Sequence, residues 1–373
     1  MLLTNAFMPD PRPYQEALSL IKAGHKVKIL CWDRGENLPE NEKIKGIEIE
    51  RIKLASRHGR GTLQIIFLGI LWLKILQRSS REELDIIYCH DFDTFPVGLI
   101  IKGIKGKKMI FDSHEIYSKM LADNVCFPLK VLIVLLEKIL IKMSDWVIVT
   151  CSAMAQFYRS YGVKRISIIG NWKNLSDFEI SKEMLEKEKV RLGIKDELVI
   201  SYIANLGPER IIEPLLEAVK EDQSVFLIIG GDGVQRPIVE KAASEVPNIK
   251  YLGFVRCTDV SLYTALSSVI YYGYNKDFGM AEFNSPNKLF DALAAGKAFI
   301  GGNFGEMGKI LREEKCGIAL DCFTKDDVIR ALKILKDNTR LQIFKNNAKE
   351  AALRKYNWIN VEKELFKIFS ELN

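Results

Sequence analysis

The sequence predicts an α/β protein with two doubly wound domains whose parallel sheets face a cleft. Short apolar segments alternate with longer segments of helical periodicity along the chain, which is the pattern of a parallel sheet covered on both faces. The alternation restarts near Gly170, in a chain of 373 residues that is long for one domain. Apolar residues make up 48% of the chain and charged residues 27%, which suffices for two full cores.

The first domain is predicted to span residues 1–170 and to begin with a strand, a loop and a helix. Its strands are expected at residues 2–5, 27–31, 86–89, 109–111 and 146–150, and its helices at 14–23, 63–78, 94–103 and 129–143. Polar loops follow three of these strands, at Asp10–Arg12, His90–Asp93 and Asp112–Glu115. Ligands of parallel sheets bind at the carboxyl ends of the strands, so we expect the three loops to face one cleft.

The second domain is predicted to span residues 171–355 and to repeat this organisation. Its strands are expected at 198–204, 225–230, 249–252, 269–272 and 298–300, and its helices at 179–191, 211–220, 234–245, 259–267, 286–295 and 325–335. Residues 356–373 form a last segment with one amphipathic helix, Trp358 to Leu372. Its apolar stripe consists of Val361, Leu365, Ile368 and Phe369.

Charge, cysteine content and missing motifs limit the classes of ligand and enzyme that fit the sequence. Residues 1–170 hold 25 Lys and Arg against 18 Asp and Glu, a balance of +7 that suggests an anionic lipid or a phosphorylated acceptor and is weak for nucleic acid. The seven cysteines form no CxxC pair, which predicts free thiols and a cytoplasmic protein. The chain lacks the GxGxxG fingerprint of dehydrogenases after its first strand, and it lacks the GxxxxGK[ST] phosphate loop.

The most informative segment is GMAEFNSPNKLFDALAAGKAFIGG, residues 279–302. A polar loop leads into a helix, with Ser285 expected at the N-cap and Pro286 in the first turn. Free amides at a helix start bind anions, and Lys288 adds a positive charge there. Asp291, one turn further on, could accept hydrogen bonds from ribose hydroxyls. A capped structural helix accounts for the same residues.

This segment resembles the donor-binding segment of the family 4 glycosyltransferases, which have the GT-B fold: two Rossmann-like domains facing a cleft, with a C-terminal helix crossing back to the first domain. The family has two glutamates separated by seven residues before a glycine. Counted back from Gly296, the second is Asp291 here and the first is Phe283, with Glu282 beside it. The SPNKLF run is similar to a variant branch of the family.

Three further segments of the second domain resemble donor-site segments of the family. YIANLGPER places Arg210 where the family presents a basic residue to the donor diphosphate, and Asn205 where an arginine is common. IIGGDG resembles the glycine turn at the family's cleft. LGFV resembles the segment that flanks the nucleotide base. The resemblance thus implies a donor site of Asn205, Gly207, Arg210, Gly231, Phe254, Ser285, Asn287, Lys288 and Asp291.

In the first domain the resemblance implies an acceptor site, with His114 similar to the histidine of the family's cleft. The implied acceptor-binding residues are Asp10, Arg12, His90, Asp91 and His114, and the implied catalytic residues are His114, Arg210, Lys288 and Glu282. Members of the family retain the anomeric configuration. No metal and no cofactor are expected, since a UDP- or GDP-sugar is the substrate and the DxD pattern at Asp91–Asp93 matches by chance.

The implied function is transfer of a sugar from a nucleotide sugar to a glycan or lipid-linked acceptor. Residues 63–78 and 129–143 are apolar with cations nearby, among them Arg57, Arg60 and Lys74. Both an interfacial membrane helix and a buried Rossmann helix fit them. A non-catalytic homologue that binds a nucleotide sugar is an alternative, motivated by Phe283 and Asn205, and a sugar-nucleotide epimerase is another. The sequence names neither the donor base and sugar, nor the acceptor, nor the oligomeric state.

Overall fold

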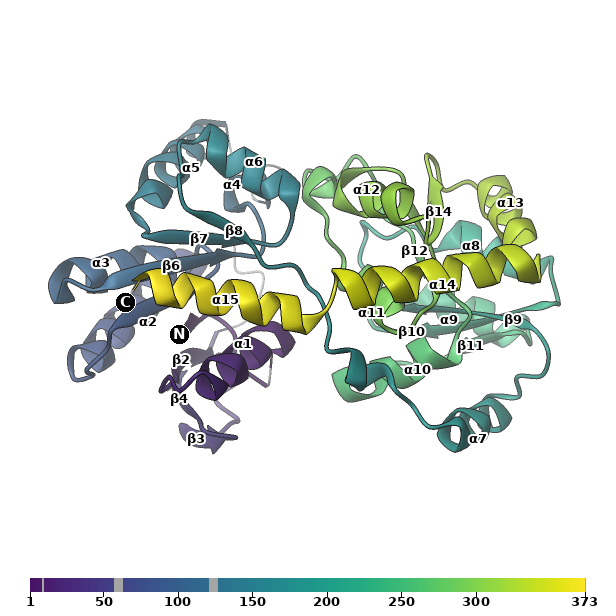
Figure 1. Cartoon of the computed structure of the whole chain (residues 1–373), viewed down its shortest axis with the longest axis horizontal. Helices are drawn as coiled ribbons and strands as arrows, with labels where there is room; N and C mark the ends of the chain where they lie inside the picture. The colour runs from purple at the N-terminus through teal and green to yellow at the C-terminus, as the bar shows by residue number, and fades with distance from the viewer. Residues whose placement is uncertain (9, 57–62, 121–126, 373) are drawn as a thin grey trace. The chain divides into compact units, whose positions relative to one another are not determined.

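Figure 1 shows the protein as a computed structural model, which describes every residue except 9, 57–62, 121–126 and 373. The predicted membrane-flanking cations Arg57 and Arg60 lie outside the described residues. The chain divides into two compact units. Unit 1 consists of Met1–Ile169 and Glu362–Asn373, and unit 2 consists of Gly170–Val361.

Unit 1 is built on an eight-stranded sheet with the order β3-β4-β2-β1-β5-β6-β7-β8. The edge strand β3 runs antiparallel to β4, whereas the other registered pairs among the described residues are parallel. The central strand β1 lies between β2 and β5, so the loop that follows it starts where those strands end. The strands are β1 (Leu2–Leu3), β2 (Lys28–Asp33), β3 (Asn41–Ile44), β4 (Ile47–Lys53), β5 (Ile86–His90), β6 (Lys108–Ser113), β7 (Trp146–Val149) and β8 (Ile166–Ile168).

Helices cover both faces of this sheet because successive strands are added in both directions along the strand order. From β1 to β2 the chain moves one way along the strand order, and from β4 through β8 it moves the other way. Right-handed crossovers therefore place α1 on one face and the later helices on the opposite face. The helices are α1 (Pro11–Lys22), α2 (Leu63–Ser80), α3 (Phe95–Lys105), α4 (Tyr117–Met120), α5 (Phe127–Leu140), the 3-10 turn η1 (Ile141–Met143) and α6 (Ser152–Ser160).

Unit 2 is built on a six-stranded sheet with the order β11-β10-β9-β12-β13-β14, and its registered pairs are parallel. The strands are β9 (Leu198–Ile203), β10 (Val225–Gly230), β11 (Ile249–Tyr251), β12 (Val269–Tyr272), β13 (Ala298–Gly302) and β14 (Gly317–Leu320). The helices are η2 (Leu175–Phe178), α7 (Lys182–Leu192), α8 (Glu213–Lys220), α9 (Arg236–Glu245), η3 (Cys257–Asp259), α10 (Val260–Leu266), η4 (Ala281–Phe283), α11 (Asn287–Ala294), α12 (Gly305–Glu314), α13 (Lys325–Leu335) and α14 (Asn338–Arg354).

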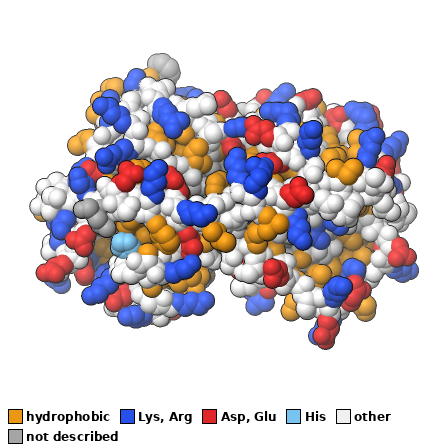
Figure 2. Space-filling model, viewed as in Figure 1, with side chains coloured by type: hydrophobic (Ala, Val, Ile, Leu, Met, Phe, Trp, Pro, Cys, Tyr) orange, Lys and Arg blue, Asp and Glu red, His pale blue; other side chains and the backbone are white. Residues whose placement is uncertain are grey.

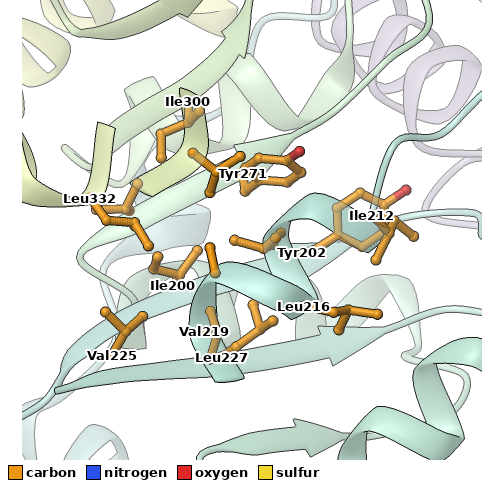
Figure 3. Close-up of a cluster of buried hydrophobic side chains, with 14 of the residues drawn as sticks. Ile200, Tyr202, Ile212, Leu216, Val219, Val225, Leu227, Tyr271, Ile300 and Leu332 are labelled. Carbon is orange, nitrogen blue, oxygen red and sulfur yellow. The ribbon is translucent and has the colours of Figure 1, made fainter. Parts of the chain in front are cut away.

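The main core of unit 2 lies between one face of its sheet and the helices α8 and α13. Alternate strand residues such as Ile200 and Tyr202 point into it and meet Leu216 and Leu332 from those helices (Figure 3). Val199, which precedes Ile200 on the strand, belongs to a separate cluster on the other face. Both faces of the sheet are thus buried, which explains why its strands are nearly continuous apolar runs.

The C-terminal helix α15 (Trp358–Leu372) begins in unit 2, and its residues from Glu362 onward belong to unit 1. There Glu362 accepts hydrogen bonds from Ser19 and Lys22 of α1, and Glu364 accepts one from Ser167. Phe369 packs against His25 and Tyr88. Within the described residues, none of the helices combines the length and hydropathy that a membrane crossing needs.

Several elements were not predicted. The strands β3, β4, β8 and β14 and the helices α4, α6, α12 and α14 were missed. The strand β3 alternates between exposed and half-buried residues, so it lacks an apolar run. The single helix predicted over residues 179–191 is present as α7, which begins three residues later, after the N-cap Ser181.

Candidate functional site

The polar loops of unit 1 meet at the carboxyl ends of β1, β5 and β6. Pro11 opens α1 behind the N-cap residue Asp10, which places Arg12 in the first turn. The Arg12 guanidinium donates to both carboxylate oxygens of Asp112, at 2.7 Å to Oδ1 and 3.2 Å to Oδ2, and to the carbonyl oxygen of Ile169 at 2.7 Å. This bidentate pair joins the start of α1 to the end of β6.

A second buried carboxylate, Glu16, shares the same guanidinium. Its Oε1 lies 3.2 Å from Arg12 Nε, and Tyr88 donates to its Oε2 at 2.8 Å. Burial and the charge of Asp112 raise the pKa of Glu16. Burial would raise the pKa of Asp112 too, but the charges of Arg12 and His114 hold it well below its usual range. Asp112 therefore carries its charge at neutral pH.

His114 follows β6 and is the more accessible of the two histidines here, with 24% of its side chain exposed. Its Nε2 lies 3.2 Å from Asp112 Oδ2, and its Nδ1 lies 3.6 Å from Asp91 Oδ2. Burial lowers the pKa of His114, but the charges of Asp91 and Asp112 outweigh this and raise it to about 9. At neutral pH the side chain is thus an imidazolium, which donates hydrogen bonds and cannot accept a proton.

The remaining predicted acceptor residues differ in their access to solvent. His90 is 1% exposed, with its Nδ1 3.3 Å from Asp112 Oδ2 and its ring stacked on Tyr88. It therefore supports Asp112 and cannot itself touch a ligand in this arrangement. Asp10 is half-buried and accepts a hydrogen bond from Asn5, and the Asp91 side chain is 44% exposed.

The described part of the chain contains one group of side chains with metal-ligand geometry, His90, Asp112 and His114, whose ligand atoms lie within 4.8 Å of one another. Both oxygens of Asp112 already accept hydrogen bonds from Arg12. A divalent cation bound there would lie beside a permanent positive charge and would have to displace it. The donor set therefore fits an ion-pair network better than a metal site.

In unit 2 the loops that follow β9, β10 and β11 are held against one another by their backbones. Ala204 N–H donates to Gly230 O at 3.0 Å, and Gly231 N–H donates to Gly253 O at 2.8 Å. Gly231 has a φ of 140°, and a Cβ there would lie 1.9 Å from Ala204 O, so only glycine fits. The predicted donor residues Asn205, Gly207, Gly231 and Phe254 lie on these loops, and Phe254 is 76% exposed.

Arg210 packs against two aromatic side chains of the same unit. Its guanidinium lies 4.7 Å from the ring centroid of Tyr272 and 5.0 Å from that of Tyr274. It also donates to the Tyr272 hydroxyl, and its Nε lies 3.0 Å from Glu209 Oε1. A short β-bridge ties Arg210 to Tyr274. These contacts orient the guanidinium before any ligand arrives.

The helix α11 begins one residue later than predicted. Pro286 is its N-cap and Asn287 its first residue, so Ser285 lies before the cap instead of on it. The reason is that Pro286 has an extended backbone, with φ −70° and ψ 136°. Ser285 is buried, and its Oγ has no hydrogen-bond partner among the described residues.

Two lysines flank one aspartate at the start of α11. Asp291 is 4% exposed and lies 2.8 Å from Lys288 Nζ and 3.3 Å from Lys173 Nζ. Lys173 also donates to Asn287 Oδ1 at 2.7 Å. Burial would raise the pKa of Asp291, but Lys173 and Lys288 hold it below its usual value. The cluster carries one net positive charge at a helix start, which suits an anionic ligand.

The structure thus gathers Ser285, Asn287, Lys288 and Asp291 at one helix start, whereas Glu282 stays exposed on η4. Phe283, which occupies the first acidic position of the family pattern, is buried. Sequence reasoning missed Lys173, Tyr88 and Tyr272. Lys173 lies 118 positions before Asp291, so no spacing in the sequence could have linked them.

Comparison with known families decides the class of the protein. The model of Glycosyltransferase Family 4 matches residues 14–176, and the model of Glycosyl transferases group 1 matches residues 185–351. The chain belongs to glycosyltransferase family 4. The family assignment predicted from the donor segment is confirmed, whereas the SPNKLF branch remains a prediction.

Two relatives illustrate this membership. The chain is 24% identical, over 95% of its own length and 91% of the relative's, to an uncharacterized glycosyltransferase of Methanocaldococcus jannaschii. It is 27% identical to the alpha-monoglucosyldiacylglycerol synthase of Acholeplasma laidlawii, over 66% of each protein. The glycosyltransferase class predicted from the sequence is therefore confirmed.

Solved structures share the fold over the whole chain. A sucrose-phosphate synthase from Thermosynechococcus elongatus superposes with a TM-score of 0.80 at 15% identity, covering 100% of this chain and 98% of that one. An Anabaena protein in complex with UDP-glucose superposes with a TM-score of 0.76 at 16% identity, covering 100% and 99%. The fold of this family 4 glycosyltransferase is GT-B, as predicted.

Proposed function

We propose that this glycosyltransferase moves a sugar from a UDP- or GDP-sugar to a glycan or lipid-linked acceptor, with retention of the anomeric configuration and without an essential metal. The observation that carries the proposal is the cluster at the start of α11, where two lysines face one aspartate beside the unpaired Ser285 Oγ. A net positive helix start suits a diphosphate. The Anabaena protein with the same fold was solved with UDP-glucose.

The chemical difficulty is departure of the nucleoside diphosphate from the anomeric carbon, because negative charge accumulates on the leaving phosphate. Preorganised positive groups aimed at that charge lower the barrier. Arg210, held in place by Tyr272 and Tyr274, is one such group. Lys288 and the free amides of α11 are others, and Lys173 keeps Asp291 paired when Lys288 turns to the phosphate.

In unit 1, His114 and Asp91 are the accessible groups of the acceptor site. Because the pKa of His114 is raised to about 9, the imidazolium orients an acceptor hydroxyl or a sugar oxygen by donating a hydrogen bond. It does not act as the base. In a retaining reaction the leaving phosphate then takes the acceptor's proton, while His114 fixes the geometry.

A lipid-linked acceptor is favoured by two observations. The relative from Acholeplasma laidlawii is named as a synthase of a glucosylated diacylglycerol. The first 170 residues of this chain carry a charge balance of +7, which favours anionic surfaces. We place the enzyme in the cytoplasm, with part of it at the inner face of the membrane.

The test is a thermal-shift panel with UDP-, GDP-, ADP- and CMP-sugars on the wild type and on Lys288→Met, followed by NMR of the product anomer. A ligand at about 100 times its Kd stabilises the folded state by about 2.7 kcal/mol. The proposal expects one UDP- or GDP-sugar to stabilise the wild type more than Lys288→Met, and the product to keep the donor's anomeric configuration. Stabilisation by none of the four, or an inverted product, would contradict it.

A further inference from the structure

Three helices of unit 1 carry large apolar side chains on their outer surface. On α5 and η1 these are 43–52% exposed, and they are Val131, Leu132, Leu135, Leu136, Ile139 and Met143. The others are Ile65, Ile66, Ile70 and Leu73 on α2 and Ile100 and Ile104 on α3. Single exposed apolar residues are ordinary, but a set on helices of one sheet face marks a contact surface. We call these residues the apolar face.

The residues of the apolar face lie on neighbouring helices on one face of the sheet. The helices α2, α3 and α5 lie on the same face of the sheet because their crossovers run in the same direction. The helix α2 packs against α3. Lys102 of α3 donates to Met143 O at 2.6 Å and lies 2.8 Å from Asp145 Oδ2, which ties α3 to the end of η1.

The orientation of α5 is fixed by its single acidic residue, Glu137. This residue is fully buried, and it accepts hydrogen bonds from Ser118 N–H at 3.3 Å and from the Tyr158 hydroxyl at 3.1 Å. The outer side of α5 and η1 therefore presents apolar side chains together with the exposed lysines Lys138 and Lys142. The four-residue spacing of 131, 135, 139 and 143 keeps the apolar residues in one stripe.

Charge decides which partner fits this surface. Two exposed lysines accompany the apolar face, Lys138 on α5 and Lys142 on η1. Lys105 ends α3, whereas the neighbouring lysines Lys102 and Lys108 pair with Asp145, and Lys107 pairs with Asp85. Figure 2 views unit 1 from the side of α1 and α15, where hydrophobic side chains lie among both basic and acidic ones. An interfacial helix buries its apolar side at the acyl boundary while its lysines reach anionic headgroups. In a symmetric dimer through this face, lysines of one copy would approach lysines of the other.

We propose that the apolar face docks unit 1 on an anionic lipid bilayer, with α5 and η1 lying in the plane of the interface. The proposal names the surface through which the proposed function reaches a lipid-linked acceptor. The same buried network links this surface to the acceptor site. The Tyr158 hydroxyl lies 2.9 Å from Ser113 Oγ, and Ser113 directly precedes His114. A docked α5 thus holds the loop that carries His114.

The experiment is co-sedimentation of the full chain, free of nucleotide, with phosphatidylcholine vesicles that contain or lack phosphatidylglycerol. The test variant replaces Val131, Leu135 and Ile139 by Gln, which keeps the helix propensity and removes the apolar stripe. The matched control replaces Met184 and Val190 by Gln, two exposed apolar residues on α7 of unit 2. Melting temperatures of all three proteins verify that they are folded.

The expected result is binding of the wild type and the control to anionic vesicles at low salt, with a partition coefficient about tenfold lower for the triple variant. High salt should weaken wild-type binding because it screens the lysines. Equal binding of the triple variant and the wild type would overturn the proposal, as would absence of wild-type binding to anionic vesicles. A dimer in light scattering that the triple variant dissociates would assign the face to a second copy instead.

Failure of this proposal and failure of the proposed function are distinguishable. Vesicle binding is measured without a donor, and the thermal-shift panel is measured without lipid. A protein that binds a nucleotide sugar but no vesicle overturns the docking surface alone. A protein that binds vesicles through the apolar face but no nucleotide sugar overturns the donor site alone.

Discussion

Replacing Arg12 by Met should destabilise unit 1 strongly. Arg12 is the cation between Asp112 and Glu16, whose side chains are both fully buried. Removing one partner of a buried ion pair leaves an uncompensated charge and costs about 3–5 kcal/mol. At roughly 2–4 °C per kcal/mol for a unit of this size, the melting temperature of unit 1 should fall by about 6–20 °C.

The assay is calorimetric unfolding of the full chain at several pH values, with Arg159→Met, an exposed arginine on α6, as the control. Because the folded pKa of Asp112 is depressed, its stabilisation is present above its unfolded pKa of about 3.9 and is lost as pH falls through the folded value. Without Arg12 the folded pKa rises, so the loss should begin at a higher pH. A fall in melting temperature no larger than that of the control would refute this reasoning.

Three further predictions concern single side chains. His114→Gln should flatten the pH dependence of stability: because the folded pKa is raised to about 9, the imidazolium's contribution is fully present below about 6.5 and lost as pH rises through 9. Urea unfolding at pH 6 and pH 10 gives the free energy of unfolding at each pH, and an equal change between the two for wild type and variant would contradict this prediction. Gly231→Ala should destabilise unit 2 by about 2 kcal/mol or more, since the Cβ would meet Ala204 O at 1.9 Å; thermal melting checks this, and an unchanged melting temperature would show that the loop relaxes. Lys173→Met should weaken nucleoside diphosphate binding about tenfold, because Lys288 then stays paired with Asp291; calorimetric titration measures this, and unchanged affinity would remove Lys173 from the site.

Buried central elements could be predicted from the sequence because they are apolar runs between polar turns. The strands at 225–230 and 269–272 and the helix at 358–372 match the predicted ranges residue for residue. The edge strand β3 was missed because it has no apolar run and is half-exposed, and its neighbour β4 was missed as well. The long helix α14 was missed although it has four buried residues at helical spacing, since three of them are alanines and give only a weak apolar signal.

The residues of the candidate site could be predicted where they lie in a recognisable sequence motif. The carboxyl ends of parallel strands located Arg12, His90 and His114, and family likeness located Arg210 and the start of α11. Pairing between distant residues could not be predicted, because Arg12 and Asp112 are 100 positions apart and only the folded sheet brings them within hydrogen-bonding distance. The charge state of His114 likewise depends on two carboxylates whose positions the fold sets.

The most direct test of the donor site is calorimetric titration of UDP and GDP into the wild type, Arg210→Met and the control Arg330→Met, which removes an exposed arginine on α13. A charge-assisted hydrogen bond contributes about 1.5–3 kcal/mol, so Arg210→Met should weaken binding of the preferred nucleotide by roughly 10- to 150-fold. The control should bind as the wild type does. Equal affinity of Arg210→Met and the wild type, with all three proteins folded, would contradict the assignment of Arg210 to the diphosphate.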